Sequence, residues 1–389
     1  MTRKVGSSTN TRRGDALRRR ASKVMGLKRG DPFVRTVGAA WRLLTTPGER
    51  GRRGAGARTL VACSGGADSS ALAIALAAAS AKPGLIVLGH VVHDLRSAAE
   101  CERDCRAVEE LAGRLGVEVM VERIRVRDGV KGEDEGNLEA RARRLRLRAL
   151  RAMAQRVDAR FIATGHHAQD VLESVIMAVA RGTGLRGLSG IAESKRLSGG
   201  VRLIRPMLNV TPSDAKEVCR RAGWAWCEDA TNEARHPLAG LRSKVRGLVV
   251  PRVLELMPGA ELGAVRSSMA ARGAQRVVAA LAVRGAARAG LSDDAKTGGE
   301  LRVVWDRAVV RRQRDVVLAE MLRRAVTRVG GGRGMRAVTR GAIAAACRVI
   351  RGGGTERKRL TIGPAEAVVD VRRVVICLRK KSKEDGRGA

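Results

Sequence analysis

The chain has 389 residues and a formal net charge of +37, which is extreme for a globular enzyme. Apolar residues make up 44% of it and aromatic residues only 2%, so we expect a packed core of Leu, Val, Ile and Ala that needs no disulfides. A charge of this size attracts polyanions and favours a nucleic-acid partner. Arginine-rich usage that reflects a GC-rich genome is the alternative explanation of the charge.

Seven cysteines, an odd number without framework spacing, indicate a reducing compartment. Cys101 and Cys105 are four residues apart, a spacing that permits a metal, but no second pair accompanies them and we expect buried small side chains. The sequence has no apolar run of transmembrane length and no signal-peptide core. We therefore expect a cytoplasmic protein with no membrane partner.

The first 57 residues are basic and rich in Gly, Ser and Thr, apart from a short apolar patch near Trp41, and they predict a disordered arm over 1–57. From residue 58, short apolar runs alternate with helical patterns. The expected strands are 59–63, 85–92, 117–124, 160–164 and 201–208. The expected helices are 69–81, 98–115, 137–157 and 168–181. This alternation predicts an α/β fold with a parallel sheet covered by helices on both faces.

Two prolines, Pro251 and Pro258, mark a break in this pattern. We expect one domain over 58–250 and a second, basic and mainly helical domain over 251–380. The second domain is expected to end in a short β segment, a terminal hairpin, after the glycines at 352–354. A charged tail over 381–389 completes the predicted organisation.

A glycine loop follows the first expected strand, at the place where parallel sheets bind ligands. Its residues are Ser64, Gly65, Gly66, Ala67, Asp68 and Ser69. Glycines let the backbone approach a phosphate, and successive N–H groups at a helix N-terminus form an anion nest. Asp68 would repel a bare phosphate, so we expect it to hold a Mg²⁺ ion that bridges phosphate oxygens. The plain alternative is a strand-to-helix turn capped by Asp and Ser.

This loop resembles the SGGxDS loop of the PP-loop ATP pyrophosphatases, which bind ATP and release pyrophosphate when they adenylate a substrate. It is not a Walker A loop, because G-x-x-x-x-G-K-[ST] is absent from the chain. The glycines at 182, 184 and 187 fit G-x-G-x-x-G but follow an expected helix, so we reject a dinucleotide site there. The later segments are similar to one branch of the superfamily, the tRNA(Ile)-lysidine synthetase family.

Two segments of the sequence, GHVVHDLRSAAECERD (89–104) and NLEARARRLRLRAL (137–150), carry the first part of this similarity. The matching residues are His90, His93, Arg96, Glu139, Arg143 and Arg146. Leu147 replaces the family's usual Tyr. A histidine at a strand end is often structural, and Arg143 pairs with Glu139 by helical spacing unless it contacts phosphate or tRNA.

The segment TGHHAQDVLESVIMAVARGTGLRGLSGI (164–191) is the second similar region. Asp170 and Glu173 are three residues apart and therefore share one helix face. The resemblance implies that they hold free lysine, whose amino groups need anionic partners, although Gln169 stands where many members have a further acid. The spacing of His166, His167 and Asp170 permits a metal, but no other ligands converge and we do not expect zinc.

The block over 205–251 is the third similar region. The matching residues are Arg205, Pro206, Glu228, Asp229, Thr231, Asn232, Arg242, Arg246 and Pro251. Ser243 and Gly247 replace the usual Asn and His. Arg242 and Arg246 are four residues apart and suit a clamp on the phosphates of ATP or tRNA. Asn232 is expected to be a turn or cap residue.

The resemblance, which covers residues 58 to 258, implies an ATP- and Mg²⁺-dependent ligase. The wobble cytidine of a CAU-anticodon tRNA(Ile) would be adenylated on its C2 oxygen, and the ε-amine of L-lysine would then displace AMP to form lysidine. Asp68, Asp170 and Glu173 are the expected catalytic residues. The expected tRNA or phosphate contacts are His93, Arg96, Arg143, Arg205, Arg242 and Arg246.

Two other functions stay open on the sequence alone. A tRNA thiolase of the same superfamily typically needs a C-x-x-C motif, which this chain lacks. A non-catalytic basic RNA-binding protein on the same scaffold is compatible with the departures at Gln169, Leu147, Ser243 and Gly247. The sequence also leaves the oligomeric state open, with a homodimer as one option.

Overall fold

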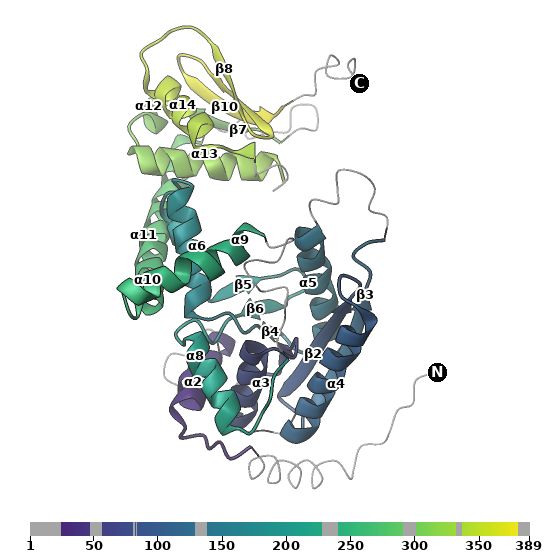
Figure 1. Cartoon of the computed structure of the whole chain (residues 1–389). Helices are drawn as coiled ribbons and strands as arrows, with labels where there is room; N and C mark the ends of the chain where they lie inside the picture. The colour runs from purple at the N-terminus through teal and green to yellow at the C-terminus, as the bar shows by residue number, and fades with distance from the viewer. Residues whose placement is uncertain are drawn as a thin grey trace. The chain divides into compact units, whose positions relative to one another are not determined.

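The computed structural model of the chain describes residues 25–46, 57–80, 82, 84–128, 138–227, 240–290, 301–331 and 337–379. The chain forms two compact units (Figure 1). The first comprises the chain up to Arg181 and Gly190–Ser268, and the second comprises Gly182–Ser189 and the chain from Met269 onward.

The first unit is built on a six-stranded sheet in the order β3-β2-β1-β4-β6-β5. Its strands are β1 (Thr59–Ala62), β2 (Ile86–His93), β3 (Glu118–Ile124), β4 (Phe161–Ala163), β5 (Ser194–Arg196) and β6 (Arg202–Ile204). All neighbours are parallel except β5, which runs antiparallel to β6 at the edge. The sheet therefore confirms the predicted α/β class, and β1 is its central strand.

Helices cover both faces of this sheet. They are α2 (Pro32–Thr45), α3 (Ala67–Ala79), α4 (Ala98–Leu115) and α8 (Pro212–Arg221) on one face and α5 (Leu138–Arg156) on the other. The helix α6 (Ala168–Ala180) follows β4. Leu60 of β1 packs toward Met153 of α5, whereas its neighbour Val61 packs among α2, α3, α4 and α8. Successive side chains of a strand point to opposite faces, so a continuous apolar run serves both layers.

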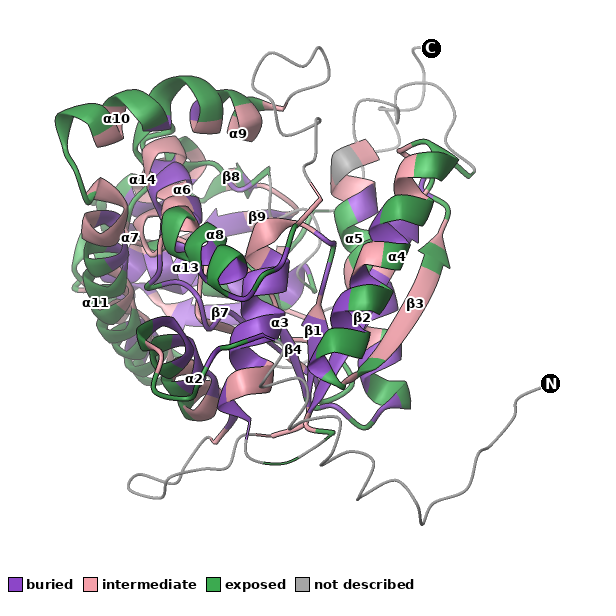
Figure 2. Cartoon of the chain, turned by 60° about the horizontal axis from the view of Figure 1, so that its bottom comes forward, coloured by how far each residue is buried: buried purple, intermediate pink, exposed green. Residues whose placement is uncertain are grey.

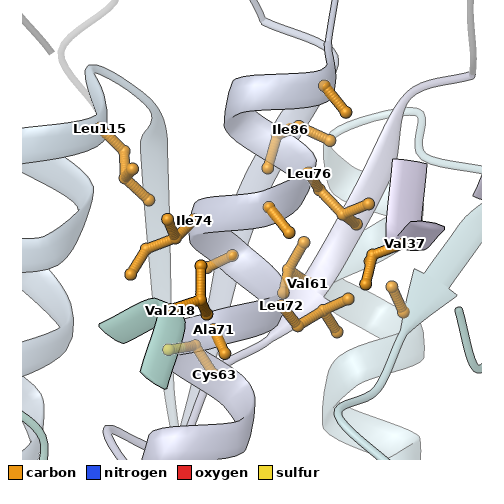
Figure 3. Close-up of a cluster of buried hydrophobic side chains, with 14 of the residues drawn as sticks. Val37, Val61, Cys63, Ala71, Leu72, Ile74, Leu76, Ile86, Leu115 and Val218 are labelled. Carbon is orange, nitrogen blue, oxygen red and sulfur yellow. The ribbon is translucent and has the colours of Figure 1, made fainter. Parts of the chain in front are cut away.

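The helix α3 is buried on almost every side, as Figure 2 shows by its colour. Its Leu72, Ile74 and Leu76 lie among side chains from α2, β1, α4 and α8 (Figure 3). A helix that is apolar all round must be surrounded by protein. The glycine loop that precedes α3 is therefore attached to a rigid part of the core.

The expected disordered arm over 1–57 is wrong for residues 25–46. These residues include α2, whose Trp41 is completely buried and donates from Nε1 to Thr59 Oγ1 at 2.9 Å. Phe33, Val34 and Val37 are buried on the same helix. Their three- and four-residue spacing with Trp41 was the available helical signal. Residues 1–24 and 47–56 lie outside the described part of the chain.

Local capping signals explain why some helix bounds were predictable. Ser97 and Glu100 form a capping box at the start of α4, and Gly116 ends it in the left-handed region at φ 65°. The predicted range 98–115 is confirmed. By contrast, the edge strand β5 was not expected, because its sequence Ser-Lys-Arg carries no apolar pattern.

The second unit contains a four-stranded antiparallel sheet in the order β7-β10-β9-β8. Its strands are β7 (Val303–Asp306), β8 (Lys358–Ile362), β9 (Ala365–Val369) and β10 (Arg373–Leu378). Its helices are α7 (Leu185–Leu188), α12 (Arg307–Val310), α13 (Asp315–Val329), α14 (Arg340–Arg351) and the later part of α11 (Ala260–Ala289). The predicted helical region with a β ending is confirmed, but β7 arises inside a stretch that was expected to be helical.

The division between the units differs from the expected boundary at 250/251. Val253 and Leu254 of α10 (Val250–Leu256) and Ala264 and Val265 of α11 pack with α6 in the first unit. Residues 251–268 therefore belong to the first unit by packing. None of the described helices is long and apolar enough to cross a membrane.

A buried arginine in the second unit donates hydrogen bonds to the backbone of two separate segments. Arg307 is 6% exposed, and its guanidinium donates only to backbone carbonyls among the described residues. The acceptors are the carbonyls of Val349, Ile350, Gly352, Gly354 and Asp370. Three of them lie at the C-terminal end of α14, where carbonyls lack intrahelical partners and a cation is favourable.

We expect Arg307→Met to destabilise the protein by at least about 3 kcal/mol, because several buried carbonyls would lose a charged donor. Urea unfolding of the full chain measures the change. Arg312→Met, at an exposed position five residues further on, is the matched control and should cost less than about 0.5 kcal/mol. Equal stability of the two variants would contradict this role for Arg307.

Candidate active site

The glycine loop is held in shape by its own serines. Ser69 Oγ accepts from the backbone N–H of Ser64 at 3.1 Å and donates to the carbonyl of Gly66 at 3.0 Å. Gly65 has φ 87°, which a side chain would strain. Gly66 is the N-cap of α3 and makes no side-chain cap bond, so the first-turn N–H groups are left for a ligand.

Two other segments pack against this loop. The backbone N–H of Cys227 donates to the carbonyl of Gly65 at 3.0 Å. A Cβ at Gly65 would lie 3.6 Å from the carbonyl of Asp104 and 3.8 Å from Cys227 Sγ. Neither Asp104 nor Cys227 was predicted to lie here, because no spacing rule connects them to the loop.

The loop between β4 and α6 meets the glycine loop at the carboxyl edge of the sheet. His167 Nε2 lies 3.4 Å from Asp68 Oδ2, and His167 Nδ1 lies 3.6 Å from Asp170 Oδ2. One buried imidazole ring thus separates the acid of the glycine loop from the first acid of α6. From the sequence, His167 was considered only for a metal site that was not expected, so this bridging position was missed.

The two predicted acids and two of the predicted arginines form a single charge cluster. It consists of Asp170, Glu173, Arg242 and Arg246. Arg242 donates from Nε to Glu173 at 2.7 Å and from Nη2 to Asp170 at 2.9 Å. Arg246 does the same at 2.6 and 3.0 Å. The acids and the arginines were predicted to form separate sites, although two acids and two arginines match in number and charge.

The arginines of the charge cluster come from an irregular helix. Arg242 belongs to α9 (Leu241–Lys244), and Arg246 to the π-helical turn η3 (Val245–Val249). Such turns are rare in proteins overall, but those that occur are often found at functional sites. The departures Ser243 and Gly247 lie on this segment, whereas Leu147 is an apolar side chain of α5 packed on the sheet.

Burial and charge shift the pKa values in this region in opposite directions. Burial lowers the pKa of His166 to about 4, although Asp170 acts against this shift. Burial also acts to lower the pKa of His167, but Asp68 and Asp170 raise it above its ordinary value. Burial acts to raise the pKa of Asp170, yet His167 and Arg242 lower it. Asp170 is therefore a carboxylate at neutral pH.

The other predicted contact residues are placed as follows. Arg96 pairs with Asp104 at 2.5 Å and has a side chain 14% exposed. Arg205 is buried and donates to the carbonyl of Ala192. Arg143 is exposed on α5 and is close enough to His166 to lower the pKa of that histidine. The pKa of His93 is lowered as well, mainly by burial. Their roles toward tRNA or phosphate stay predictions.

Several predicted residues cannot be placed. Glu228, Asp229, Thr231 and Asn232 lie outside the described residues, and so does the side chain of Glu139. Among the residues that the structure does describe, no group of three or more His, Cys, Asp or Glu side chains could hold a metal ion. This includes the combination of His166, His167 and Asp170.

Asp68 nevertheless suits a Mg²⁺ ion that arrives with ATP. Its side chain is 43% exposed on the first turn of α3, beside uncapped N–H groups. Mg²⁺ keeps most of its waters and is commonly held by one or two carboxylates together with substrate phosphates. A single accessible carboxylate at a phosphate-binding turn fits that requirement.

The PP-loop domain family matches residues 47–253, and the chain belongs to this family. The chain is similar to a tRNA(Ile)-lysidine synthase of Symbiobacterium thermophilum, with 32% identity over 73% of this chain and 59% of that protein. It is also similar to one of Dehalococcoides mccartyi, with 32% identity over 57% of this chain and 47% of that protein. The chain thus spans about half to three-fifths of the length of these relatives.

Among solved structures, the chain is similar to the U34-tRNA thiolase NcsA of Methanococcus maripaludis. The match covers 62% of this chain and 80% of that one, at 16% identity and a TM-score of 0.46. We draw no chemistry from so distant a likeness.

The shifted pKa of His166 predicts a pH-dependent loss of stability. In the unfolded chain His166 binds a proton near pH 6.5, but in the folded protein only near pH 4. Protonation of His166 in the unfolded chain therefore favours unfolding as the pH falls between these values. It lowers the free energy of unfolding by about 3 kcal/mol at pH 4.

We expect His166→Gln to remove this part of the acid sensitivity. Urea unfolding at pH 7 and pH 4 should show that the wild type loses about 3 kcal/mol more than the variant does. The control is the difference in unfolding free energy between the two proteins above pH 7, where His166 is neutral in both the folded and the unfolded state. An identical pH dependence in both proteins would rule out a neutral His166 in the folded protein at pH values above 4.

Proposed function

We propose that this chain is an ATP-dependent ligase that joins L-lysine to C2 of the wobble cytidine of a CAU-anticodon tRNA(Ile), forming lysidine. The observation that carries the proposal is the meeting of the glycine loop and the α6 acids at the carboxyl edge of the sheet, across His167. Family membership and relatives named tRNA(Ile)-lysidine synthase support it.

In the first step, the N–H groups at the start of α3 would bind phosphate oxygens of ATP, and Asp68 would hold the ion that accompanies them. Mg²⁺ supplies charge neutralisation on the leaving pyrophosphate when bound. The C2 oxygen of the cytidine attacks the α-phosphorus, and the bond to pyrophosphate breaks. This activation is needed because the C2 oxygen is a poor leaving group by itself.

In the second step, the ε-amine of lysine attacks C2 of the adenylated cytidine, and the C2–oxygen bond breaks to release AMP. The amine must first lose a proton, and Asp170, which is ionised at neutral pH, is the proposed group that positions lysine and receives it. Glu173 is the proposed second lysine-binding acid. The wobble base is unpaired in its loop, where its edge is open to recognition.

Basic surfaces of the chain support an RNA partner. On α5, Arg144 and Arg148 are exposed, are one helical turn apart and have no partner among the described residues. Arg141 and Arg151 flank them and donate to the Asp128 carbonyl and to Ser198 Oγ. Like charges at this spacing repel one another, which an RNA backbone would relieve. We place the proposed reaction in the cytoplasm, where both ATP and tRNA are present. A homodimer is a further proposal, which light scattering tests.

The proposed reaction is tested with purified protein, ATP, labelled lysine and a CAU-anticodon tRNA(Ile) transcript. We expect lysine incorporation with stoichiometric pyrophosphate release, and a loss of at least about 100-fold for Asp68→Asn. Asp158→Asn is the matched control, since Asp158 is exposed and has φ 50°, which Asn also tolerates.

Three other outcomes would replace this proposal. Incorporation that survives Asp68→Asn would remove the assigned role of that acid. Sulfur transfer in place of lysine transfer would indicate a thiolase. Salt-sensitive tRNA binding without incorporation would indicate a non-catalytic RNA-binding protein.

The exposed arginines of α5 give a separate prediction about binding. The double variant Arg144→Gln/Arg148→Gln should weaken tRNA binding and reduce the slope of log K against log salt by about 1 for each phosphate that the variant no longer neutralises. Filter binding without ATP or lysine measures it. Arg220→Gln, which removes an exposed arginine already paired with Glu217, should leave the slope unchanged. An unchanged slope in the double variant would exclude this surface.

A further inference from the structure

The members of the charge cluster are not equally accessible. The side chain of Glu173 is fully buried and that of Asp170 is 10% exposed, whereas those of Arg242 and Arg246 are 31% and 34% exposed. The two acids therefore lie beneath the two guanidinium groups. A ligand that approaches the charge cluster from solvent meets arginine before it meets carboxylate.

Within the described part of the chain, the hydrogen bonds of the charge cluster leave one donor of each arginine unused. Each arginine bonds the acids through Nε and Nη2. Nη1 of Arg242 and Nη1 of Arg246 make no hydrogen bond to the described residues. The two arginines are four residues apart on the same helical segment, so their free Nη1 groups lie on one face. Two neighbouring guanidinium donors suit the two oxygens of a carboxylate.

The acids, by contrast, have their oxygens occupied. Glu173 accepts from both arginines through its two oxygens. Asp170 accepts from both arginines through Oδ1 and from the backbone N–H of His167 through Oδ2. Two adjacent guanidinium groups repel one another, and two buried carboxylates beneath them balance that charge. The acids are thus placed to hold the arginines together.

The position of the charge cluster suits the head group of an amino acid. Asp170 is one imidazole ring away from Asp68 at the glycine loop. In lysine, the ε-nitrogen lies roughly 6 Å from Cα when the side chain is extended at ordinary bond lengths. A lysine held by its carboxylate at the arginines therefore has the length to direct its ε-amine across His167 toward the nucleotide site.

We propose that Nη1 of Arg242 and Nη1 of Arg246 bind the α-carboxylate of the amino-acid substrate, and that Asp170 and Glu173 position the two arginines. The inference rests on the proposed function and sharpens it. It changes the expected order of contacts, because the substrate carboxylate meets the arginines while Glu173 contacts no substrate atom. It also makes Asp170 a positioning residue, because its oxygens accept from the two arginines and from the N–H of His167.

The test compares L-lysine with cadaverine, which has the same terminal amine and no carboxylate. With ATP and the tRNA transcript, we expect wild-type kcat/KM for lysine to exceed that for cadaverine by at least about 100-fold, the value of two good charge-assisted hydrogen bonds. Arg242→Lys and Arg246→Lys keep the positive charge over the acids but lack Nη1. Each should reduce the lysine-to-cadaverine preference at least about tenfold, mainly through KM for lysine.

Two controls accompany this comparison. Arg252→Lys, an exposed arginine of α10 that pairs with Glu255, should keep the wild-type preference. KM for ATP should be unchanged in Arg242→Lys and Arg246→Lys, and urea unfolding should show that both variants are folded.

Three results would overturn the proposal. One is an unchanged preference in both lysine variants, and another is equal use of lysine and cadaverine by the wild type. The third is a rise in KM for ATP in place of lysine, which would assign the arginines to a phosphate. Calorimetric titration with L-lysine and cadaverine separates this inference from the reaction. Carboxylate-dependent binding without incorporation would refute only the proposed function, and no difference in binding would refute the inference itself.

Discussion

The active-site region depends on the parallel pairing of β1 with both β2 and β4. Thr59, Leu60 and Val61 pair with β2 on one side and with β4 on the other. The connections that leave β1 and β4 begin at the carboxyl ends of these neighbouring strands, where parallel sheets bind ligands. The glycine loop and the His166–His167 loop both begin there. A Cβ at Gly165 would lie 2.9 Å from the Asp68 carbonyl, so the two backbones are in close contact.

The charge cluster is the second constraint, because Glu173 is fully buried. A buried carboxylate is unfavourable unless it is paired and hydrogen-bonded. Here Arg242 and Arg246 supply both requirements and connect α6 to the segment from α9 to η3. In a chain of net charge +37, the interior of this region is locally balanced while the surface is strongly basic. The ion pairs that stabilise this region are thus the same ones to which we assign amino-acid binding in the proposed function.

The accuracy of the sequence-based predictions followed the range of the interactions concerned. Helix α4 was predicted to the residue because Ser97, Glu100 and Gly116 are local signals. Helix α2 was missed although its apolar spacing was available, because the surrounding basic, Gly-, Ser- and Thr-rich sequence indicated disorder and the burial of Trp41 against Thr59 is a tertiary contact. Strand β5 was missed because an edge position leaves little trace in three residues. Strand β7 was missed because its antiparallel pairing with β10, distant in sequence, leaves no local signal in so short a segment.

The sequence by itself determined the parallel α/β class, the glycine loop with Asp68, and the two acid and two arginine positions, because spacing and residue type are local properties. Only the tertiary structure decided that Asp170, Glu173, Arg242 and Arg246 are one cluster, and that His167 lies between Asp68 and Asp170. Except for His167–Asp170, these contacts join residues about 70 to 100 positions apart. Chain folding, not helical or strand periodicity, brings such residues together.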